Sequence, residues 1–215
     1  MKIIYHCYGG SHSSVTAASI HLGLLPEDRV PGREMFWNLQ LFDRQEADQQ
    51  GHIYFVGVDE HGHDIYLTAR RNKPQILENV FAGLTEIFAL PRQDYILVDA
   101  MHSVNSLMKL GGFLSRRWGL VSLGRPIVTI GTQIAYFRLV HLVQKVKGLI
   151  REEDHENSVF QRHHVPTGSP GGSNSHRQAV KGKTAGKDPV RGPIVFGYQR
   201  AGRGNNLPGE GRCRK

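Results

Sequence analysis

The stretch that decides the fold is KIIYHCYGGSHSSVTAASIHLG, residues 2–23. Residues 2–7 form a short apolar run of β-formers that ends just before Gly9-Gly10, which is typical of a buried strand entering a turn. Residues 13–22 then place apolar side chains among small ones, with serine at the start as a plausible cap and glycine after the end. The chain therefore opens with a strand, a glycine loop and a helix.

The next part of the chain combines strand and helix patterns. Residues 52–58 and 64–69 are strand-like and flank the turn-forming segment 59–63, so they predict a β-hairpin. Residues 74–90 begin with proline and carry apolar side chains at helical spacing, which indicates an amphipathic helix. Residues 95–99 form an apolar strand that ends in an acid.

The remaining elements predict the fold class. A helix is expected at about 103–118, a strand at 126–131 and a helix at about 132–149. Continuously apolar strands alternating with helices are typical of an α/β protein with a three-layer, mainly parallel sheet and helices on both faces, of the P-loop-like or Rossmann-like kind. The loops after residues 7, 99 and 131 should then meet at the sheet edge where ligands bind.

The cysteine content and the N-terminal residues indicate the cellular compartment that we expect for the chain. Of 215 residues only Cys7 and Cys213 are cysteines, and they lie at opposite ends of the chain, which excludes a disulfide framework and favours a reducing, cytoplasmic setting. The N-terminal residues lack both a signal peptide and a spanning apolar helix. We therefore expect no membrane partner.

The charge distribution divides the chain near residue 150. Residues 1–150 hold 15 basic and 13 acidic side chains, whereas residues 151–215 hold 12 and 6, together with 11 of the 25 Gly and 5 of the 10 Pro. This composition predicts an α/β domain over 1–150 and a disordered basic Gly/Pro-rich tail over 151–215. The tail either is solvated without a ligand or binds nucleic acid through phosphate contacts.

The loop after the first strand is the main candidate site. Two glycines allow a tight turn with exposed N–H groups, and hydroxyl and imidazole donors follow where a helix begins, which is how anion sites are built. The candidate ligand-binding residues are Gly9, Gly10, Ser11, His12, Ser13 and Ser14. The alternative is an ordinary turn followed by a helix cap.

Known phosphate motifs match this loop incompletely. A Walker A loop requires a lysine, and His12 would have to replace it. A phosphatase C-x5-R motif starting at Cys7 requires arginine at position 13, where the chain has Ser13. Cys7 is a candidate nucleophile at a helix N-terminus, although a cysteine at a strand end is more often a small core residue.

Other polar groups add candidate catalytic residues. Asp99 and His102 follow a strand and would lie near the loop in a parallel sheet, where they could serve as a base or magnesium ligand. The acids and histidines of segment 59–63 could bind a metal, but a solvated turn is the favoured interpretation, and we assign no metal site. The pairs Arg70-Arg71 and Arg116-Arg117 are interpreted as solvated surface rather than phosphate ligands.

Two strings carry a resemblance to a known family. IYHCYGGSHSSVTAASIHLG at 4–23 and GVDEHGHDIY at 57–66 resemble an uncharacterised domain-of-unknown-function family of Gram-positive, mostly spore-forming bacteria. The resemblance covers roughly residues 1–150 and implies a small cytosolic α/β protein, with no activity or catalytic residue to transfer.

The leading functional hypothesis is binding of a phosphorylated small molecule or nucleotide at loop 9–14, with possible phosphoryl transfer or hydrolysis. The first alternative is a non-catalytic regulatory or protein-interaction domain, because the loop lacks the strong cation that phosphoryl chemistry needs. The second is nucleic-acid binding through the tail.

Overall fold

The first strand, β1 (Lys2–Cys7), lies inside a mixed sheet in the computed structural model of the chain, which describes residues 1–45, 51–91, 94–163 and 195–196. The sheet order is β2-β3-β1-β4-β5. β1 runs parallel to both of its neighbours, and β2 is antiparallel to β3, as the predicted hairpin requires. The other strands are β2 (Ile53–Val58), β3 (Asp64–Ala69), β4 (Tyr95–Asp99) and the two-residue β5 (Val195–Phe196).

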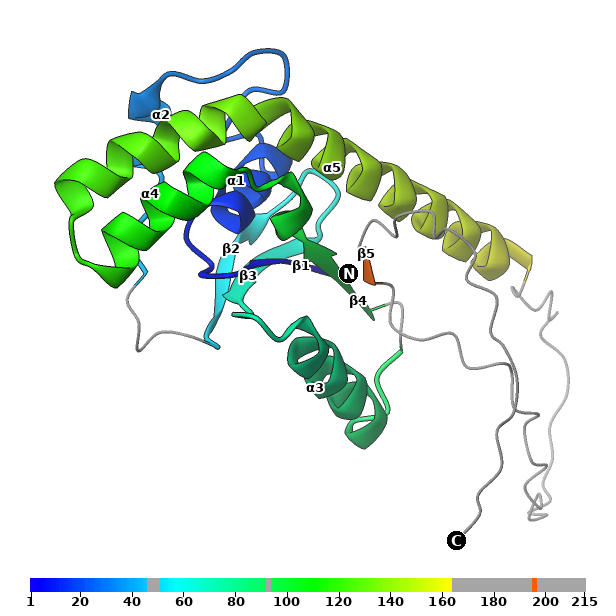
Figure 1. Cartoon of the computed structure of the whole chain (residues 1–215). Helices are drawn as coiled ribbons and strands as arrows, with labels where there is room; N and C mark the ends of the chain where they lie inside the picture. The colour runs from blue at the N-terminus through cyan, green and yellow to red at the C-terminus, as the bar shows by residue number, and fades with distance from the viewer. Residues whose placement is uncertain (46–50, 92–93, 164–194, 197–215) are drawn as a thin grey trace, which may run out of the picture.

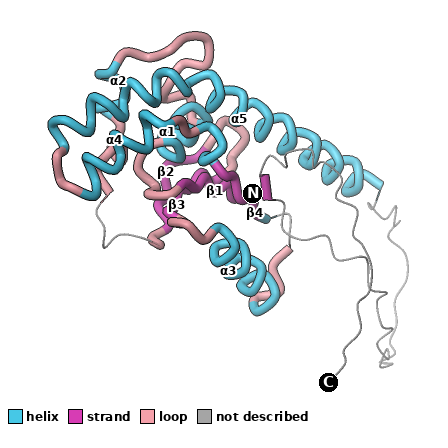
Figure 2. Tube along the Cα trace, in the orientation of Figure 1, coloured by secondary structure: helices cyan, strands magenta, loops and turns pink. Residues whose placement is uncertain are grey.

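Helices cover the two faces of the sheet (Figures 1 and 2). Ile3 and Tyr5 of β1 belong to the main core, whereas Ile4 packs with Leu77 and Phe81 on the other side. This split follows from the alternation of side chains along a strand. The helices on the main-core side are α1 (Ser13–His21), α2 (Arg33–Asn38), α4 (Ser106–Arg117) and α5 (Val121–His163), while α3 (Pro74–Ile87) lies on the opposite face; the short 3-10 helix η3 (Ala100–Ser103) follows β4.

The predicted strand at 126–131 is wrong, because these residues form part of helix α5. The buried residues Val128, Ala135, Leu139 and Val143 continue one helical face through and beyond this segment. A six-residue apolar run does not by itself distinguish a buried helix from a buried strand. Here the helical spacing of the buried residues continues beyond the run and identifies the segment as part of a helix. The expected loop after residue 131 therefore does not exist at the sheet edge.

Helices α4 and α5 pack at very close range through glycines. A Cβ atom added to Gly111 would lie 2.3 Å from the backbone nitrogen of Val128, and one added to Gly124 would lie 2.4 Å from that of Ser115. Only glycine permits such an approach of two helix backbones. The two helices consequently form a tight antiparallel hairpin.

The class of the fold is confirmed as α/β, with a mixed sheet. Helix α5 continues to His163 across the expected boundary near residue 150, which remains a prediction. Disorder was expected over residues 151–215, but residues 151–163 are helical and Val195–Phe196 form β5; the rest of the tail, 164–194 and 197–215, lies outside the described residues.

Candidate functional site

The carboxyl ends of β1, β3 and β4 meet at one edge of the sheet, where they hold the glycine loop. The backbone N–H of Arg70 donates to the carbonyl of Cys7 and that of Arg71 donates to the carbonyl of Tyr8, each at 3.0 Å. The backbone N–H of Tyr8 also donates to the thioether Sδ of Met101, which follows β4, at 3.2 Å. The loop is thus attached to the ends of both neighbouring strands; the loops after residues 7 and 99 meet at this edge as predicted, whereas the contact with the end of β3 was not predicted.

Asp99 is the centre of the polar contacts at this edge. Its Oδ2 accepts a hydrogen bond from Nη2 of Arg70 at 2.7 Å, and its Oδ1 accepts one from the backbone N–H of Met101 at 2.9 Å. Nε2 of His102 lies 3.7 Å from Oδ2. The interpretation of Arg70 as solvated surface is wrong, because its side chain is mostly buried and paired with a carboxylate.

His6 lies directly beside this pair and is completely buried. Its Nδ1 is 3.8 Å from Oδ1 of Asp99, and neither ring nitrogen has a hydrogen-bond partner among the described residues. Burial lowers the pKa of His6 to about 4, because desolvation outweighs the favourable effect of Asp99. The imidazole is therefore neutral at pH 7.

Two backbone N–H groups of the loop donate hydrogen bonds to sulfur atoms. In addition to the contact between Tyr8 and Met101, the N–H of Gly10 donates to Sγ of Cys7 at 3.1 Å, and Oγ of Ser14 lies 3.1 Å from the same sulfur. Gly10 has a φ of 68°, and a Cβ there would meet the side chains of Gln45 and Ala69. Sulfur is a weak acceptor, but Cys7 and Gly10 are both buried, so the N–H of Gly10 is directed into the protein, whereas Tyr8 is exposed.

The loop serines face inward. Ser11, Ser13 and Ser14 are at most 2% exposed, and the hydroxyl of Ser11 donates to the carbonyl of Gly9. Cys7 is buried as well. A ligand at this edge would contact a different set of residues, of which Tyr8, Gly9, Arg71 and His102 reach the surface or lie partly open to it.

His12 belongs to a separate buried cluster. Its Nε2 lies 3.0 Å from Oδ1 of Asp43, which is fully buried. The same carboxylate accepts hydrogen bonds from Oγ of Ser115 at 2.8 Å and from Nε of Arg125 at 3.2 Å. This cluster connects the start of α1 to both α4 and α5, so His12 has a partner that would have to be displaced before it could act as a free donor.

The hairpin turn also forms a buried network rather than a solvated tip. The carboxylate of Asp59 lies 3.1 Å from Nε2 of His21 and 3.0 Å from Nδ1 of His63, and Nδ1 of His21 lies 2.7 Å from the hydroxyl of Tyr5. Burial opposes ionisation of Asp59, but hydrogen bonds from His63 and from the backbone of His61 outweigh it and lower the pKa to about 2. The hydrogen bond between Asp59 and His21 holds the turn against α1, and the favoured interpretation of a solvated turn does not apply to Asp59 and His63, whose side chains are both buried.

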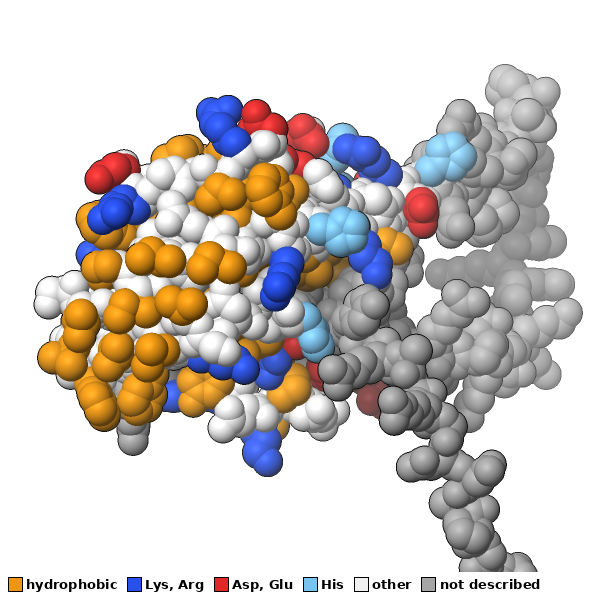
Figure 3. Space-filling model, turned by 45° about the horizontal axis from the view of Figure 1, so that its top comes forward, with side chains coloured by type: hydrophobic (Ala, Val, Ile, Leu, Met, Phe, Trp, Pro, Cys, Tyr) orange, Lys and Arg blue, Asp and Glu red, His pale blue; other side chains and the backbone are white. Residues whose placement is uncertain are grey.

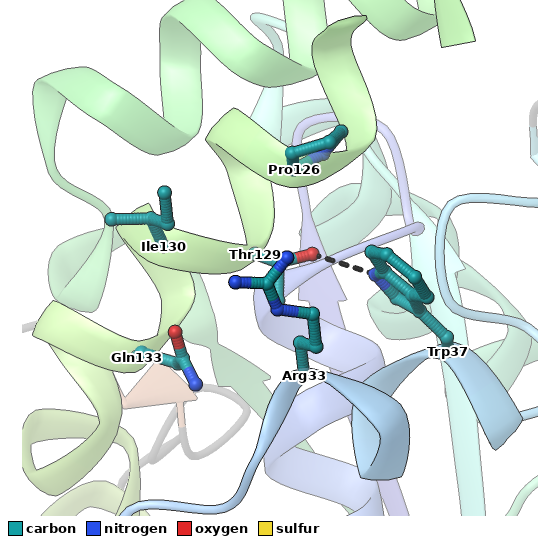
Figure 4. Close-up of a pocket in the computed structure, with 6 residues that line it drawn as sticks. All are labelled: Arg33, Trp37, Pro126, Thr129, Ile130 and Gln133. Atoms are coloured by element: carbon teal, nitrogen blue, oxygen red, sulfur yellow. Dashed lines mark hydrogen bonds between the residues drawn. The ribbon is translucent and has the colours of Figure 1, made fainter. Parts of the chain in front are cut away.

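A hollow lies away from the sheet edge, between α2 and α5 (Figure 4). Arg33 and Trp37 come from α2, and the indole N–H of Trp37 donates to Oγ1 of Thr129 at 3.0 Å. The remaining lining residues are Pro126, Ile130 and Gln133 of α5. The space amounts to about 20 Å³, enough for one water molecule and too small for a metabolite.

No three His, Cys, Asp or Glu side chains converge on a metal-sized site within the part of the chain that the structure describes. Asn105, which follows Asp99 and His102 in the sequence, accepts from the N–H of Met108 and caps α4. The magnesium-ligand role considered for Asp99 has no converging set of oxygens to support it.

Sequence reasoning missed two residues at the edge. Arg70 and Arg71 immediately follow a strand that is parallel to β1, and this position was the available signal for placing them beside the loop. Asp43 was missed because residues 24–51 show no clear periodicity.

One comparison with known proteins gives a match. The model of a family described as "Protein of unknown function (DUF3189)" matches residues 2–148. No curated protein and no solved structure matches the chain.

Proposed function

The chain belongs to the DUF3189 family, whose description assigns no activity, and we propose that it binds a phosphorylated small molecule, with a nucleotide as the preferred class, at the carboxyl edge of β1, β3 and β4. We also propose that it does so in the cytoplasm. The proposal concerns binding first, and turnover is a separate question for experiment.

The arrangement of strands and helices supports a ligand at this edge. The chain leaves β1 through α1 on one face of the sheet, and it passes from β3 to β4 through α3 on the other. In open α/β sheets such a change of face opens a crevice at the strand ends, where phosphorylated ligands bind. We propose on this basis that the fold is a P-loop-like or Rossmann-like variant that carries one antiparallel edge strand.

The observation that carries the proposal is the position of Arg71 beside the glycine loop. Its guanidinium carbon lies 5.7 Å from the centre of the Tyr8 ring, and its backbone N–H bonds the carbonyl of Tyr8. The loop has no lysine or arginine of its own, and Arg71, in the turn that follows β3, supplies that cation. An exposed guanidinium at the carboxyl edge of the strands suits a phosphate group.

Tyr8 supports the choice of a nucleotide within the phosphorylated class. Tyr8 is 43% exposed, at the start of the loop. Stacking of a base on an exposed aromatic ring contributes about 1–3 kcal/mol and requires no hydrogen-bond readout. A ligand that combines a phosphate with a flat ring therefore fits Arg71 and Tyr8 together.

Among the candidate catalytic residues, His102 is the most accessible. Its side chain is 52% exposed, whereas Cys7 is buried and both oxygens of Asp99 accept hydrogen bonds. If a bound phosphoryl group is transferred or hydrolysed, His102 is the residue we propose as its acid or base.

A calorimetric titration tests the proposal. The full chain is titrated with ADP, with ribose 5-phosphate and with pyrophosphate, and phosphate release is followed in parallel. Arg71→Ala should weaken every phosphate ligand about 10-fold or more, because a hydrogen bond to a charged group contributes roughly 1.5–3 kcal/mol. Tyr8→Leu should weaken ADP and leave pyrophosphate unchanged.

Arg29→Ala is the matched control, since Arg29 is exposed, pairs with the adjacent Asp28 among the described residues and lies on another loop. Equal affinity of wild type, Arg71→Ala and Arg29→Ala for ADP would contradict the proposal. Phosphate release by the wild type that is lost in His102→Ala would extend it to catalysis.

A further inference from the structure

Helices α4 and α5 present a continuous apolar surface to solvent, which we name the apolar face. On α5 the exposed positions Leu123, Ile130, Ile134 and Phe137 follow a single helical stripe, opposite the buried side of the same helix. Leu110 of α4 and Trp118 of the connecting turn extend it, and these six side chains are between 47% and 65% exposed. Figure 3 shows rows of hydrophobic side chains over these two helices.

The part of the chain that carries the apolar face has an excess of basic residues. Residues 100–151 contain eight Lys or Arg and no Asp or Glu, and the acids of α5, from Glu152 to Glu156, lie beyond the apolar face toward the end of the helix. Residues 1–99 contain 13 acidic and 8 basic side chains. The exposed side chains of Arg138 and Lys145 follow the apolar face along α5. An apolar surface continued by cations is complementary to an anionic bilayer, in which acyl chains lie beneath negatively charged headgroups.

Helix α5 is not suited to crossing a membrane in this fold. The segment Val121–Glu152 is long and apolar enough to do so, but half of its apolar window is buried in the domain, as in the core helix of a soluble protein. Crossing would require Val128, Leu139 and Val143 to leave the core. Contact with the surface of a membrane requires no such rearrangement.

We propose that the apolar face is a peripheral binding surface for anionic lipid bilayers, with α4 and α5 lying in the plane of the headgroups. This replaces the expectation of no membrane partner, which considered spanning segments alone. A second copy of the chain is a poorer occupant, because symmetric pairing would bring two basic surfaces together without acidic partners. Trp118, at the turn between the two helices, lies where interfacial tryptophans are favoured.

The helix α3 offers a natural comparison. It also exposes apolar residues, among them Ile87 at 75%, but its segment 74–90 carries two acids and no Lys or Arg. An anionic bilayer would repel this surface. Exposed isoleucines on the two helices therefore form a matched pair for mutation.

Flotation with phosphatidylcholine vesicles, with and without phosphatidylglycerol, tests the proposal on the full chain. We expect binding only to the anionic vesicles. Ile134→Asp should lower the vesicle affinity at least 10-fold, because it removes an apolar side chain that the bilayer would cover and adds a negative charge. Ile87→Asp should leave the affinity unchanged, and Arg138→Gln or Lys145→Gln should each lower it about fivefold.

Circular dichroism confirms that each variant is folded. Equal affinity of Ile134→Asp and wild type would overturn the proposal and assign any vesicle binding to other parts of the chain. A fall caused by Ile87→Asp alone would also overturn it. So would a dimer of wild type that Ile134→Asp dissociates, if neither protein binds vesicles, since a second copy would then be the occupant of the apolar face.

Discussion

Replacement of His6 by leucine should remove a large part of the acid sensitivity of the fold. The imidazole is fully buried in β1, and neither nitrogen has a hydrogen-bond partner among the described residues. Leucine suits a buried strand and brings no polar atom that needs a partner. We therefore expect His6→Leu to have nearly wild-type stability at pH 7.5, within about 1 kcal/mol.

The direction of the pH effect follows from the lowered pKa. His6 has a pKa of about 4 in the folded chain and about 6.5 when unfolded, so below pH 6.5 the unfolded chain binds a proton that the folded chain excludes. The free energy of unfolding therefore falls as the pH drops from 6.5 to 4, and the loss is complete below 4. At about 1.4 kcal/mol for each pH unit, this one residue contributes roughly 3 kcal/mol of acid destabilisation.

Urea unfolding between pH 4 and 7.5 measures this difference. The stability of wild type should fall by roughly 3 kcal/mol more than that of His6→Leu over this range, since the other titrating groups are common to both proteins. His52→Leu is the control, because His52 is exposed. Parallel curves for wild type and His6→Leu would refute the interpretation of His6 as a buried neutral histidine.

Two further substitutions test the packing that surrounds the site. Asp43→Ala removes a fully buried carboxylate at a residue with a φ of 54°. It should lower the free energy of unfolding in urea by about 3–5 kcal/mol, because an arginine and a histidine lose their buried partner. The control Asp28→Ala, at an exposed residue, should lower it by less than about 0.5 kcal/mol. Gly111→Ala places a Cβ against the backbone of Val128 and should cost about 1–3 kcal/mol, whereas Gly83→Ala, with no atom within 4 Å, should stabilise α3 by about 0.5–1 kcal/mol. A thermal melt in which the two glycine variants behave alike would contradict the close packing of α4 on α5.

Much of the fold could be predicted because local patterns and tertiary structure agree. β1 occupies the predicted residues 2–7, and β3 occupies the predicted 64–69. In both, the apolar run is bounded by turn residues, so the sequence leaves little choice of boundary. The helix beginning at Pro74 was also predicted from its apolar spacing and its proline at the first turn.

The strand predicted at 126–131 shows where local patterns fail. Its β-branched residues favour a strand, but packing against α1 and α4 makes the whole segment helical. Helix propensity alone treats glycines as helix breakers, but the glycines of this part of α5 allow the backbone of α4 to approach closely. The helical interpretation needs the partner helices, which a short window of sequence does not contain.

The position of the candidate site could be predicted, but the orientation of its side chains could not. The glycine loop lies at the carboxyl edge of the strands, with Asp99 close by, as the parallel sheet implied. Whether Ser11 or Tyr8 faces solvent depends on loop torsions such as the positive φ of Gly10. The contact between Arg70 and Asp99 depends on the strand order, which the sequence alone leaves open.

The most direct test of the proposed site is an amide chemical-shift titration of the isotopically labelled chain with ADP and with pyrophosphate. We predict that the largest shifts occur at the backbone amides of Tyr8, Gly10 and Arg71, with smaller changes along α5. Largest shifts at Trp37 and Thr129, or no saturable shift with either compound, would contradict a phosphate site at the carboxyl edge of β1, β3 and β4.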